Sequence, residues 1–526
     1  MVNLYSLFIY GDHPVSAKRN RRNGGRLAKI AHRKKTSQME APNFLTRDIP
    51  CYELLNEEEL VRIEDHADWI LQEVGIEFWD DKESLKLFKD AGATVKGNRI
   101  RFDKGHALEL CKTAPREFEM HARNPKRSTI FGGNRLIFGP AYGSPFVYDL
   151  KNGRRPGTMN DFNNLIKLAH MTPWLHHTSG TVCEPVDIPV NKRHLDMVYA
   201  HLKYSDKPFM GGVTAPERAE DSIEMARIVF GKEFLKSNCV IQGNINVNSP
   251  LVYDNTMSEA LKTYARANQG VVITPFILGG AMSPVTMPAA VAQAHAETMI
   301  GVALTQLISP GSSAVYGNFL TTMDLKTGAP TFGTPESSLA TLAVGQMARR
   351  LGLPFRAGGH YTASKVADAQ SMQESADSMF PAFLAGANFV HQAAGWLEGG
   401  LVVGYEKFIL DSERLGILHR MGLGMNIDEK TLAFSAYREN LPGENFLGTK
   451  HTAENFENAN FRCELADNNS FEQWEEDGSK NAEQRAYERW NQMLEEYVEP
   501  PLDESIDEEL IGFITKKKES MVDEWY

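Results

Sequence analysis

The 526-residue sequence has few cysteines and lacks the common metal- and nucleotide-binding signatures. Its five cysteines are scattered and form no C-x-x-C pair, which argues against a zinc ribbon or a disulfide framework and fits a reducing compartment. It also has no H-E-x-x-H, no P-loop and no G-x-S-x-G. An enzyme with this sequence would therefore take its reactive group from elsewhere, and no metal ligands are expected.

Long apolar runs are absent as well. No stretch approaches the ~18 apolar residues of a membrane-spanning helix, and no signal peptide is recognisable, so we expect a cytoplasmic protein. The formal net charge of -12 is uneven, because residues 1–40 hold nine Lys and Arg against two acidic residues. Without interleaved aromatic residues or a known binding module, this basic segment does not predict nucleic-acid binding. We expect residues 1–42 to form a flexible arm.

Short β-prone runs alternate with helical patterns from about residue 160 onwards. The strands are expected near 177–182, 208–213, 239–245, 271–276, 314–318, 354–358 and 388–392. Helices are expected near 192–204, 216–230, 257–268, 288–308, 336–351, 372–386 and 406–421. This alternation predicts parallel βαβ units in an α/β fold, with a TIM (β/α)8 barrel as the best fit and an open doubly wound sheet as the alternative. An eighth strand is expected from the ends of the region.

The remaining segments are predicted to flank this barrel, which we assign to residues 131–421. Residues 43–130 are expected to be mostly helical, with one helix that begins after Asn56 and ends at Gly75. Residues 422–526 read as an acidic helical extension, because residues 464–526 hold nineteen acidic residues against six Lys and Arg.

A parallel α/β barrel keeps its active site at the carboxyl ends of its strands. The candidates that follow predicted strands or open the next helix are Asn244, Asn246, Phe276, Phe319, Glu336, His360, Tyr361, Trp396 and Glu398. Several of them are aromatic, and Tyr142 lies in another predicted loop. Aromatic faces attract quaternary ammonium groups by about 0.5–2 kcal/mol per contact, although such rings also simply fill space. Trp396 is the strongest candidate, because neighbouring glycines would let a ligand approach it.

Several longer segments carry a family resemblance. They are GGHYTASKVADAQ, LAGANFVHQAAGWLEGGL, GYEKFILDSE, TPFILGGAMSPVTMPAAVAQAHAE, LISPGSSAVYG and ENFLGTKHT. Together they resemble the MttB superfamily, the trimethylamine:corrinoid methyltransferases and their relatives without pyrrolysine. The resemblance spans about residues 45–512. It implies a TIM barrel that binds a small methylated amine and passes a methyl group to the Co(I) of a corrinoid carried by a partner protein.

The sequence departs from the trimethylamine enzymes in one loop. Those enzymes carry pyrrolysine after the sixth strand, where this chain has His360 and Tyr361. The difference favours the quaternary-amine branch, with a substrate similar to glycine betaine that already has a neutral amine as leaving group. No D-x-H-x-x-G run is present, so we expect the corrinoid (cobalamin) on a separate protein and no covalently bound cofactor.

The resemblance and the strand-end positions together suggest roles for the candidates. His360, Tyr361 and Glu398 are expected to be catalytic, with Glu398 as a counter-charge to the ammonium group. Asn244, Asn246, His360 or a backbone amide would bind a substrate carboxylate, and Glu336 would cap a helix or bind the substrate. We expect a homo-oligomer. Direct methyl transfer to tetrahydrofolate and a non-catalytic betaine-binding barrel are the alternative functions, while a barrel lyase or isomerase would need a base and usually a metal.

Overall fold

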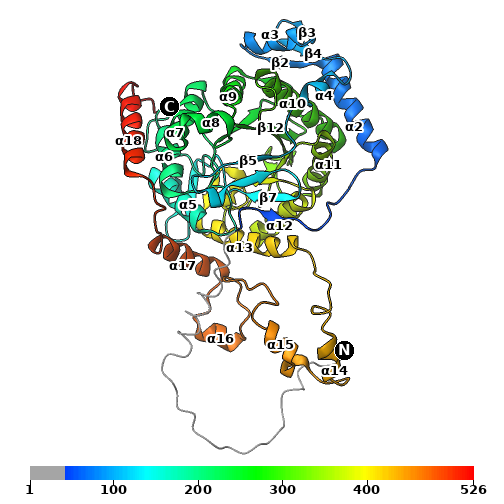
Figure 1. Ribbon diagram of the computed structural model, residues 1–526, viewed down its shortest axis with the longest axis vertical. Helices are drawn as coiled ribbons and strands as arrows, with labels where there is room; N and C mark the ends of the chain where they lie inside the picture. The colour runs from blue at the N-terminus through cyan, green and yellow to red at the C-terminus, as the bar shows by residue number, and fades with distance from the viewer. Residues whose placement is uncertain (1–41, 526) are drawn as a thin grey trace, which may run out of the picture. The chain divides into compact units, whose positions relative to one another are not determined.

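The computed structural model describes residues 42–525, which form a mixed α/β fold around one curled, mainly parallel sheet (Figure 1). The strands pair in the order β7-β17-β16-β13-β12-β10, and every one of these pairs is parallel. They are β7 (Arg135–Phe138), β10 (Gln242–Val247), β12 (Gly270–Gly279), β13 (Ala314–Gly317), β16 (Phe355–Gly358) and β17 (Phe389–His391). The strands expected near 239–245, 271–276, 314–318, 354–358 and 388–392 are therefore confirmed, and β7 precedes them.

Two further strands were predicted wrongly as regular strands. Near 177–182 and 208–213 the chain forms only an isolated bridge between Met210 and Gln242. Ser179 has a positive φ of 67°, which interrupts an extended strand, and Pro208 has no N–H to donate. The paired strands consequently form a curled sheet that is open between β7 and β10.

Helices cover the outer side of this sheet and agree closely with the helical spacing of the sequence. They are α6 (Arg193–Tyr204), α7 (Pro216–Phe230), α9 (Asn255–Arg266), α10 (Met287–Ile308), α11 (Pro335–Leu351), α12 (Ala369–Leu384) and α13 (Tyr405–Gly422), with α5 (Met159–Met171) and α8 (Lys232–Ser237) in addition. Helix α10 is buried from Ala290 to Gln306 because it packs both on β12 and on the N-terminal helices. Among residues 42–525, no helix has both the length and the apolar character that a bilayer crossing requires.

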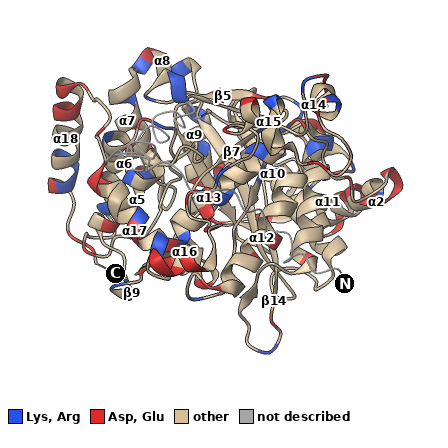
Figure 2. Cartoon of the chain, turned by 90° about the horizontal axis from the view of Figure 1, so that it is seen from below, with Lys and Arg blue, Asp and Glu red and all other residues tan. Residues whose placement is uncertain are grey.

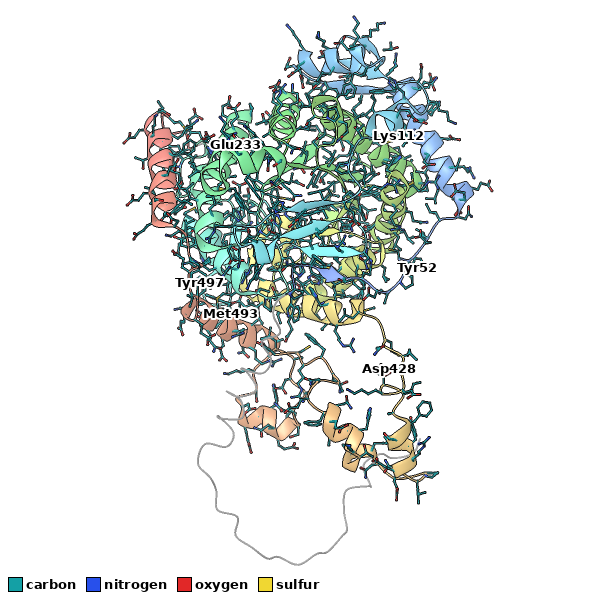
Figure 3. All side chains as sticks on the ribbon, in the orientation of Figure 1. Tyr52, Lys112, Glu233, Asp428, Met493 and Tyr497 are labelled. Atoms are coloured by element: carbon teal, nitrogen blue, oxygen red, sulfur yellow. The ribbon has the colours of Figure 1, made fainter. Side chains whose placement is uncertain are left out.

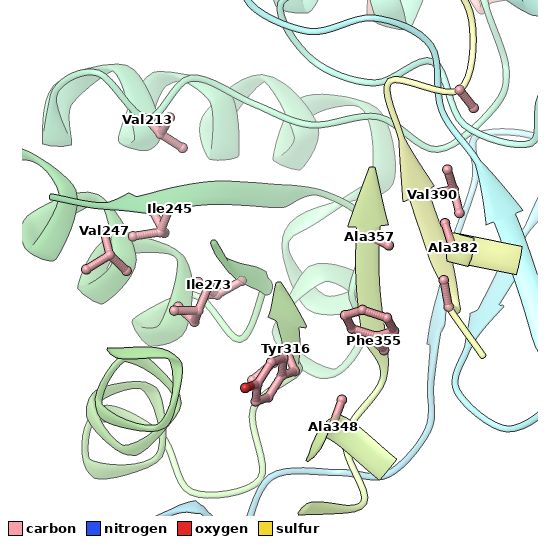
Figure 4. Packing of buried hydrophobic residues seen from close by; sticks show 14 of the residues in the cluster. Val213, Ile245, Val247, Ile273, Tyr316, Ala348, Phe355, Ala357, Ala382 and Val390 are labelled. Atoms are coloured by element: carbon pink, nitrogen blue, oxygen red, sulfur yellow. The ribbon is translucent and has the colours of Figure 1, made fainter. Parts of the chain in front are cut away.

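The two faces of the sheet carry different side chains, since successive residues of a strand point to opposite sides. The outer face packs against the helices through an extensive apolar core (Figure 4), with Ile273, Tyr316, Phe355, Ala357 and Val390 from the strands. The inner face holds a smaller apolar cluster that includes Ile137, Val272, Val315 and Phe389. Further along the strands the inner face becomes polar, because Arg356 lies between the outward Phe355 and Ala357.

The N-terminal region begins with β1 (Leu45–Thr46), which pairs with β7. Helix α2 (Glu57–Trp69) starts at Asn56 with a capping box, continues as a π-helical turn (Ile70–Val74) and ends at Gly75, as predicted. Beyond it lie β2 (Ile76–Phe78), α3 (Lys82–Asp90), β3 (Thr94–Lys96), β4 (Arg99–Arg101), α4 (His106–Cys111), β5 (Phe118–Met120) and β6 (Thr129–Phe131). The basic arm predicted for residues 1–42 falls outside the described residues, except for Pro42.

The C-terminal region contains α14 (Phe434–Glu439), α15 (Lys450–Asn455), α16 (Phe471–Glu476), α17 (Ala482–Glu495) and α18 (Glu504–Glu519). Acidic side chains are prominent on α16 and α18 (Figure 2). Met493 is buried and the Tyr497 hydroxyl donates to the Tyr204 carbonyl at 2.9 Å, which fastens this segment to the body (Figure 3). Lys203 pairs with Asp507 at 2.8 Å, so α18 is held to α6 by charge.

Candidate functional site

Four aromatic rings meet beyond the carboxyl ends of β13 and β16, and we call them the aromatic cluster: Phe319, Phe332, Tyr361 and Trp396. Phe319 opens β14 (Phe319–Met323), Phe332 follows β15 (Pro330–Thr331), Tyr361 follows β16, and Trp396 begins β18 (Trp396–Leu397). The ring centroids of Tyr361 lie 4.9 Å from Trp396, 5.2 Å from Phe319 and 5.4 Å from Phe332. Phe276 stacks on Phe319 at 4.7 Å and is 36% exposed, so the cluster reaches solvent there.

Two glycines make this arrangement possible. A Cβ at Gly358 would overlap the Tyr361 hydroxyl, and a Cβ at Gly400 would overlap the Trp396 ring. The four rings therefore pack closely, and the cavity beside Phe319 and Tyr361 measures only about 20 Å³, room for about one water molecule. Trp396 is 5% exposed, and its indole Nε1 has no hydrogen-bond partner.

A buried polar network lies directly beside the aromatic cluster. Arg356, which is 1% exposed, donates from Nη1 to the Asn318 carbonyl and from Nη2 to Gln392 Oε1, both at 2.6 Å. The Tyr361 hydroxyl donates to the same Gln392 Oε1 at 3.2 Å. Burial lowers the pKa of Arg356 and raises that of Tyr361. The guanidinium group of Arg356 and the hydroxyl of Tyr361 thus donate to the same amide oxygen.

His391 and Tyr142 extend the polar inner face. His391 Nε2 lies 2.5 Å from Ser179 Oγ, and the Tyr142 ring is 4.9 Å from the imidazole. Burial, together with the charge of Arg356, holds the pKa of His391 well below its usual range. Burial raises the pKa of Tyr142 to about 12. Both side chains are therefore uncharged at neutral pH.

Asn244 and Asn246 lie on β10 and face the same side of the sheet. Asn244 Nδ2 donates to Asn246 Oδ1 at 3.1 Å, and Thr274 Oγ1 donates to Asn244 Oδ1 at 3.1 Å. Asn244 is buried, whereas Asn246 is exposed. The register pairs Asn244 with Val272 of the inner face, so both amides belong to the same side of the sheet as Arg356.

His360 is not brought into the aromatic cluster, in contrast to the prediction that it acts on the substrate. Its imidazole is fully buried, with Nδ1 at 2.6 Å from the Ala393 carbonyl and 3.6 Å from Asp411. Asp411 forms an ion pair with Lys407 on α13. Burial first, and then the charge of Lys407, holds the pKa of His360 well below its usual range. The backbone at φ 49° turns this side chain towards α13 while Tyr361 points to the cluster.

Neither of the two predicted glutamates is buried with the aromatic cluster. Glu398 forms an ion pair with Arg154 at 2.8 Å, and the Arg154 guanidinium lies over the Phe146 ring at 3.6 Å. This pairing makes Glu398 a poor counter-charge for a ligand. Glu336 is exposed in the first turn of α11, where a carboxylate interacts favourably with the helix dipole. The helix-capping alternative fits Glu336 better than substrate binding.

Two side chains of the site were not among the candidates from the sequence: Phe332 and Arg356. A charged residue inside the apolar run of residues 353–358 was the available signal for Arg356. Phe332 carried no comparable signal, because it reaches the cluster from an irregular hairpin.

The sequence is similar to known methyltransferases over most of its length. The family described as trimethylamine methyltransferase (MTTB) matches residues 21–522. The glycine betaine methyltransferase of Desulfitobacterium hafniense strain Y51 is 38% identical, covering 90% of this chain and 99% of that protein. The trimethylamine methyltransferase MttB of D. hafniense strain DSM 10664 / DCB-2 is 27% identical over 86% of this chain and 91% of the relative. The proline betaine:corrinoid methyltransferase of Eubacterium limosum is 28% identical over 78% and 84%. This chain therefore belongs to the trimethylamine methyltransferase family.

Proposed function

We propose that this methyltransferase removes a methyl group from a quaternary amine of the glycine betaine type and transfers it to the Co(I) corrinoid of a partner protein. The aromatic cluster carries the proposal, because it gathers four rings where a parallel α/β fold exposes its active site. The relatives named for glycine betaine and proline betaine support the same substrate class. The loop at His360 and Tyr361 has no pyrrolysine, which favours a substrate that is already charged.

The aromatic cluster suits a trimethylammonium group, because ring faces attract its positive charge and the apolar rings match its methyl groups. Each ring face attracts a cation by about 0.5–2 kcal/mol, and a desolvated site gives the larger values. The rings now contact one another, so a bound ammonium group would separate Tyr361 and Trp396 from Phe319 and Phe332. Such a rearrangement exchanges ring–ring contacts for ring–cation contacts. The exposed edge of Phe276 marks the side from which the ligand enters.

The reaction requires little acid–base chemistry from the protein. The N–CH3 bond breaks, its electron pair stays on nitrogen, and glycine betaine becomes the dimethylglycine anion, whose tertiary amine is neutral. No proton donor is needed, which agrees with the raised pKa of Tyr142 and the lowered pKa of His391, because neither change produces an effective acid at neutral pH. The protein would contribute by orienting the methyl group and by excluding water. The corrinoid, when its carrier protein is bound, would supply the nucleophile that accepts the methyl group.

The geometry supports particular roles for the candidate residues. Phe276, Phe319, Tyr361 and Trp396 would bind the ammonium group, together with Phe332. Asn244 and Asn246 would line the inner side of the site, and Tyr142 would close it near His391. His360 would act as a positioning residue, because its bond to Ala393 links the Tyr361 loop to the loop that carries Trp396.

We further propose that the sheet closes into a (β/α)8 barrel. Backbone hydrogen bonds from His176 to Phe138, from Thr178 to Pro208 and from Gly211 to Gln242 support closure across the gap between β7 and β10. Residues 43–130, 131–421 and 422–526 would then be the N-terminal region, the barrel and the C-terminal extension. A homo-oligomer is also proposed, and light scattering on the purified protein tests it.

The decisive experiment is methyl transfer with defined components. The protein is mixed with glycine betaine and a reduced corrinoid protein, and dimethylglycine is quantified by mass spectrometry. Product that requires the corrinoid protein supports the proposal. Product formed with tetrahydrofolate alone would reassign the methyl acceptor, and tight binding without product would favour a non-catalytic betaine-binding protein. A thermal shift with trimethylamine and none with glycine betaine, carnitine or proline betaine would contradict the substrate class.

A further inference from the structure

We infer that Arg356 binds the carboxylate of a betaine substrate, so that the site selects zwitterions over simple quaternary ammonium ions. This inference rests on the proposed function and names the part of the substrate that the inner face recognises. The sequence prediction assigned that role to Asn244, Asn246, His360 or a backbone amide, and Arg356 was not among the candidates.

The first observation is the burial of an unneutralised charge. Arg356 is 1% exposed and belongs to the largest fully buried side chains of the described residues. Its hydrogen bonds go to two neutral oxygens, the Asn318 carbonyl and Gln392 Oε1. No acidic side chain is among the groups that act on its charge, whereas the phenols of Tyr361 and Tyr142 are. A buried charge without a counter-ion is costly, and a ligand carboxylate would remove that cost.

The second observation is unused hydrogen-bonding capacity at the same place. Arg356 Nε has no partner in the structure, and neither have Asn318 Oδ1 or His391 Nδ1. Guanidinium groups bind carboxylates through two parallel N–H bonds, with a geometry that a single lysine ammonium does not reproduce. Arg356 therefore offers a free donor, beside two donors that already have neutral acceptors, to an incoming carboxylate.

The third observation is the position of Arg356 relative to the aromatic cluster. Gln392 Oε1 accepts from Arg356 Nη2 at 2.6 Å and from the Tyr361 hydroxyl at 3.2 Å. The Tyr361 ring in turn contacts Trp396. A cation-binding surface and an anion-binding group thus lie side by side. Glycine betaine has one methylene between its ammonium nitrogen and its carboxylate, and this short spacing matches adjacent sites.

Other buried cations lack this combination. Lys207 Nζ donates to three backbone carbonyls, those of Ala169, Thr172 and Leu175, at 2.6–2.8 Å. Lys407 is paired with Asp411. Arg47 is buried as well, but it donates to the Ala387 carbonyl ahead of β17, at the opposite end of the strand from His391. Arg47 therefore provides a matched control for the loss of a buried arginine.

The test begins with ligands and the unchanged protein. Choline keeps the trimethylammonium group of glycine betaine and replaces the carboxylate by a hydroxymethyl group. Hydrogen bonds to a charged group are worth about 1.5–3 kcal/mol, so calorimetry should find glycine betaine bound about 10- to 100-fold more tightly than choline. Equal affinities would overturn the role of Arg356 while leaving the proposed function intact. Binding of neither ligand would contradict the proposed function itself.

Variants then test whether Arg356 is responsible for the preference for glycine betaine over choline. Arg356→Met should reduce the preference for glycine betaine over choline to about threefold or less, with choline affinity unchanged. Arg356→Lys should retain part of the preference, and Arg47→Met should retain all of it. If Arg356 only supported the fold, both ligands would weaken together in Arg356→Met, and that result would overturn the inference. Should Arg356→Met fail to fold, Arg356→Lys and the ligand comparison decide the question.

Discussion

Replacement of Trp396 separates cation recognition from simple packing. The indole contacts three other rings, with centroid distances of 4.9 Å to Tyr361, 6.1 Å to Phe332 and 6.2 Å to Phe319. Truncation to alanine would cost about 3–5 kcal/mol of unfolding free energy, as for other buried aromatic residues, and would obscure any effect on binding. Trp396→Leu and Trp396→Phe are better variants, because both keep an apolar side chain and only phenylalanine keeps a π face.

The expected magnitude follows from one lost cation–π contact. A value of about 1 kcal/mol predicts that the Kd for glycine betaine rises about fivefold in Trp396→Leu. In Trp396→Phe the Kd should stay close to that of the unchanged protein, because phenylalanine keeps a π face. Isothermal titration calorimetry measures both values. The matched ligand is 3,3-dimethylbutanoate, which has the shape of glycine betaine with carbon in place of the charged nitrogen.

This neutral-centred ligand should bind the leucine and phenylalanine variants equally well, because its tert-butyl group carries no charge for the ring face to attract. If Trp396→Leu weakens both ligands to the same extent, Trp396 acts by packing alone. That outcome would remove the cation-binding role from the aromatic cluster.

Three further predictions follow from other parts of the site and the core. Gly358→Ala should lower the unfolding free energy by about 1–3 kcal/mol in urea, because the new methyl group overlaps the Tyr361 hydroxyl, whereas an unchanged stability would mean that Tyr361 moves freely. Glu398→Gln should leave the Kd for glycine betaine within about twofold, because its carboxylate is already paired with Arg154 and partly exposed pairs contribute little; a tenfold loss would restore Glu398 as a counter-charge. The unfolding temperature should fall steeply as the pH is lowered from 7.5 to 5.5. Burial lowers the pKa of several histidines, so the unfolded chain binds more protons below about pH 6.5 and stability rises with pH in that range, by up to about 1.4 kcal/mol per unit for each histidine. The histidines concerned are His170, His176, His177, His201, His295, His360, His391 and His419. A flat profile over this range would show that these histidines are accessible to protons in the folded protein.

Much of the fold could be predicted because its signals are local. Helices α6 and α7 begin and end at or within one residue of the bounds expected from apolar spacing, and the cap at Asn56 was read directly from the residues that follow it. The expected strand around Ser179 was wrong because apolar composition does not reveal a positive φ. Strand ends were also predicted well, which is why Tyr361 and Trp396 were found before any geometry was known.

The chemistry of the site depended on contacts between distant residues. Glu398 and Arg154 are 244 positions apart. The local sequence around Glu398 therefore does not predict the ion pair that makes it a poor counter-charge for the ligand. The orientation of His360 towards α13, away from its neighbour Tyr361, was equally invisible. The sequence by itself determined the order of helices and strands, the family and the loops that carry aromatic rings, because spacing, caps and motifs act over a few residues. Only the tertiary structure decided that Arg356 is a buried cation without a counter-ion beside those rings, because burial and charge pairing depend on which distant segments the fold brings together.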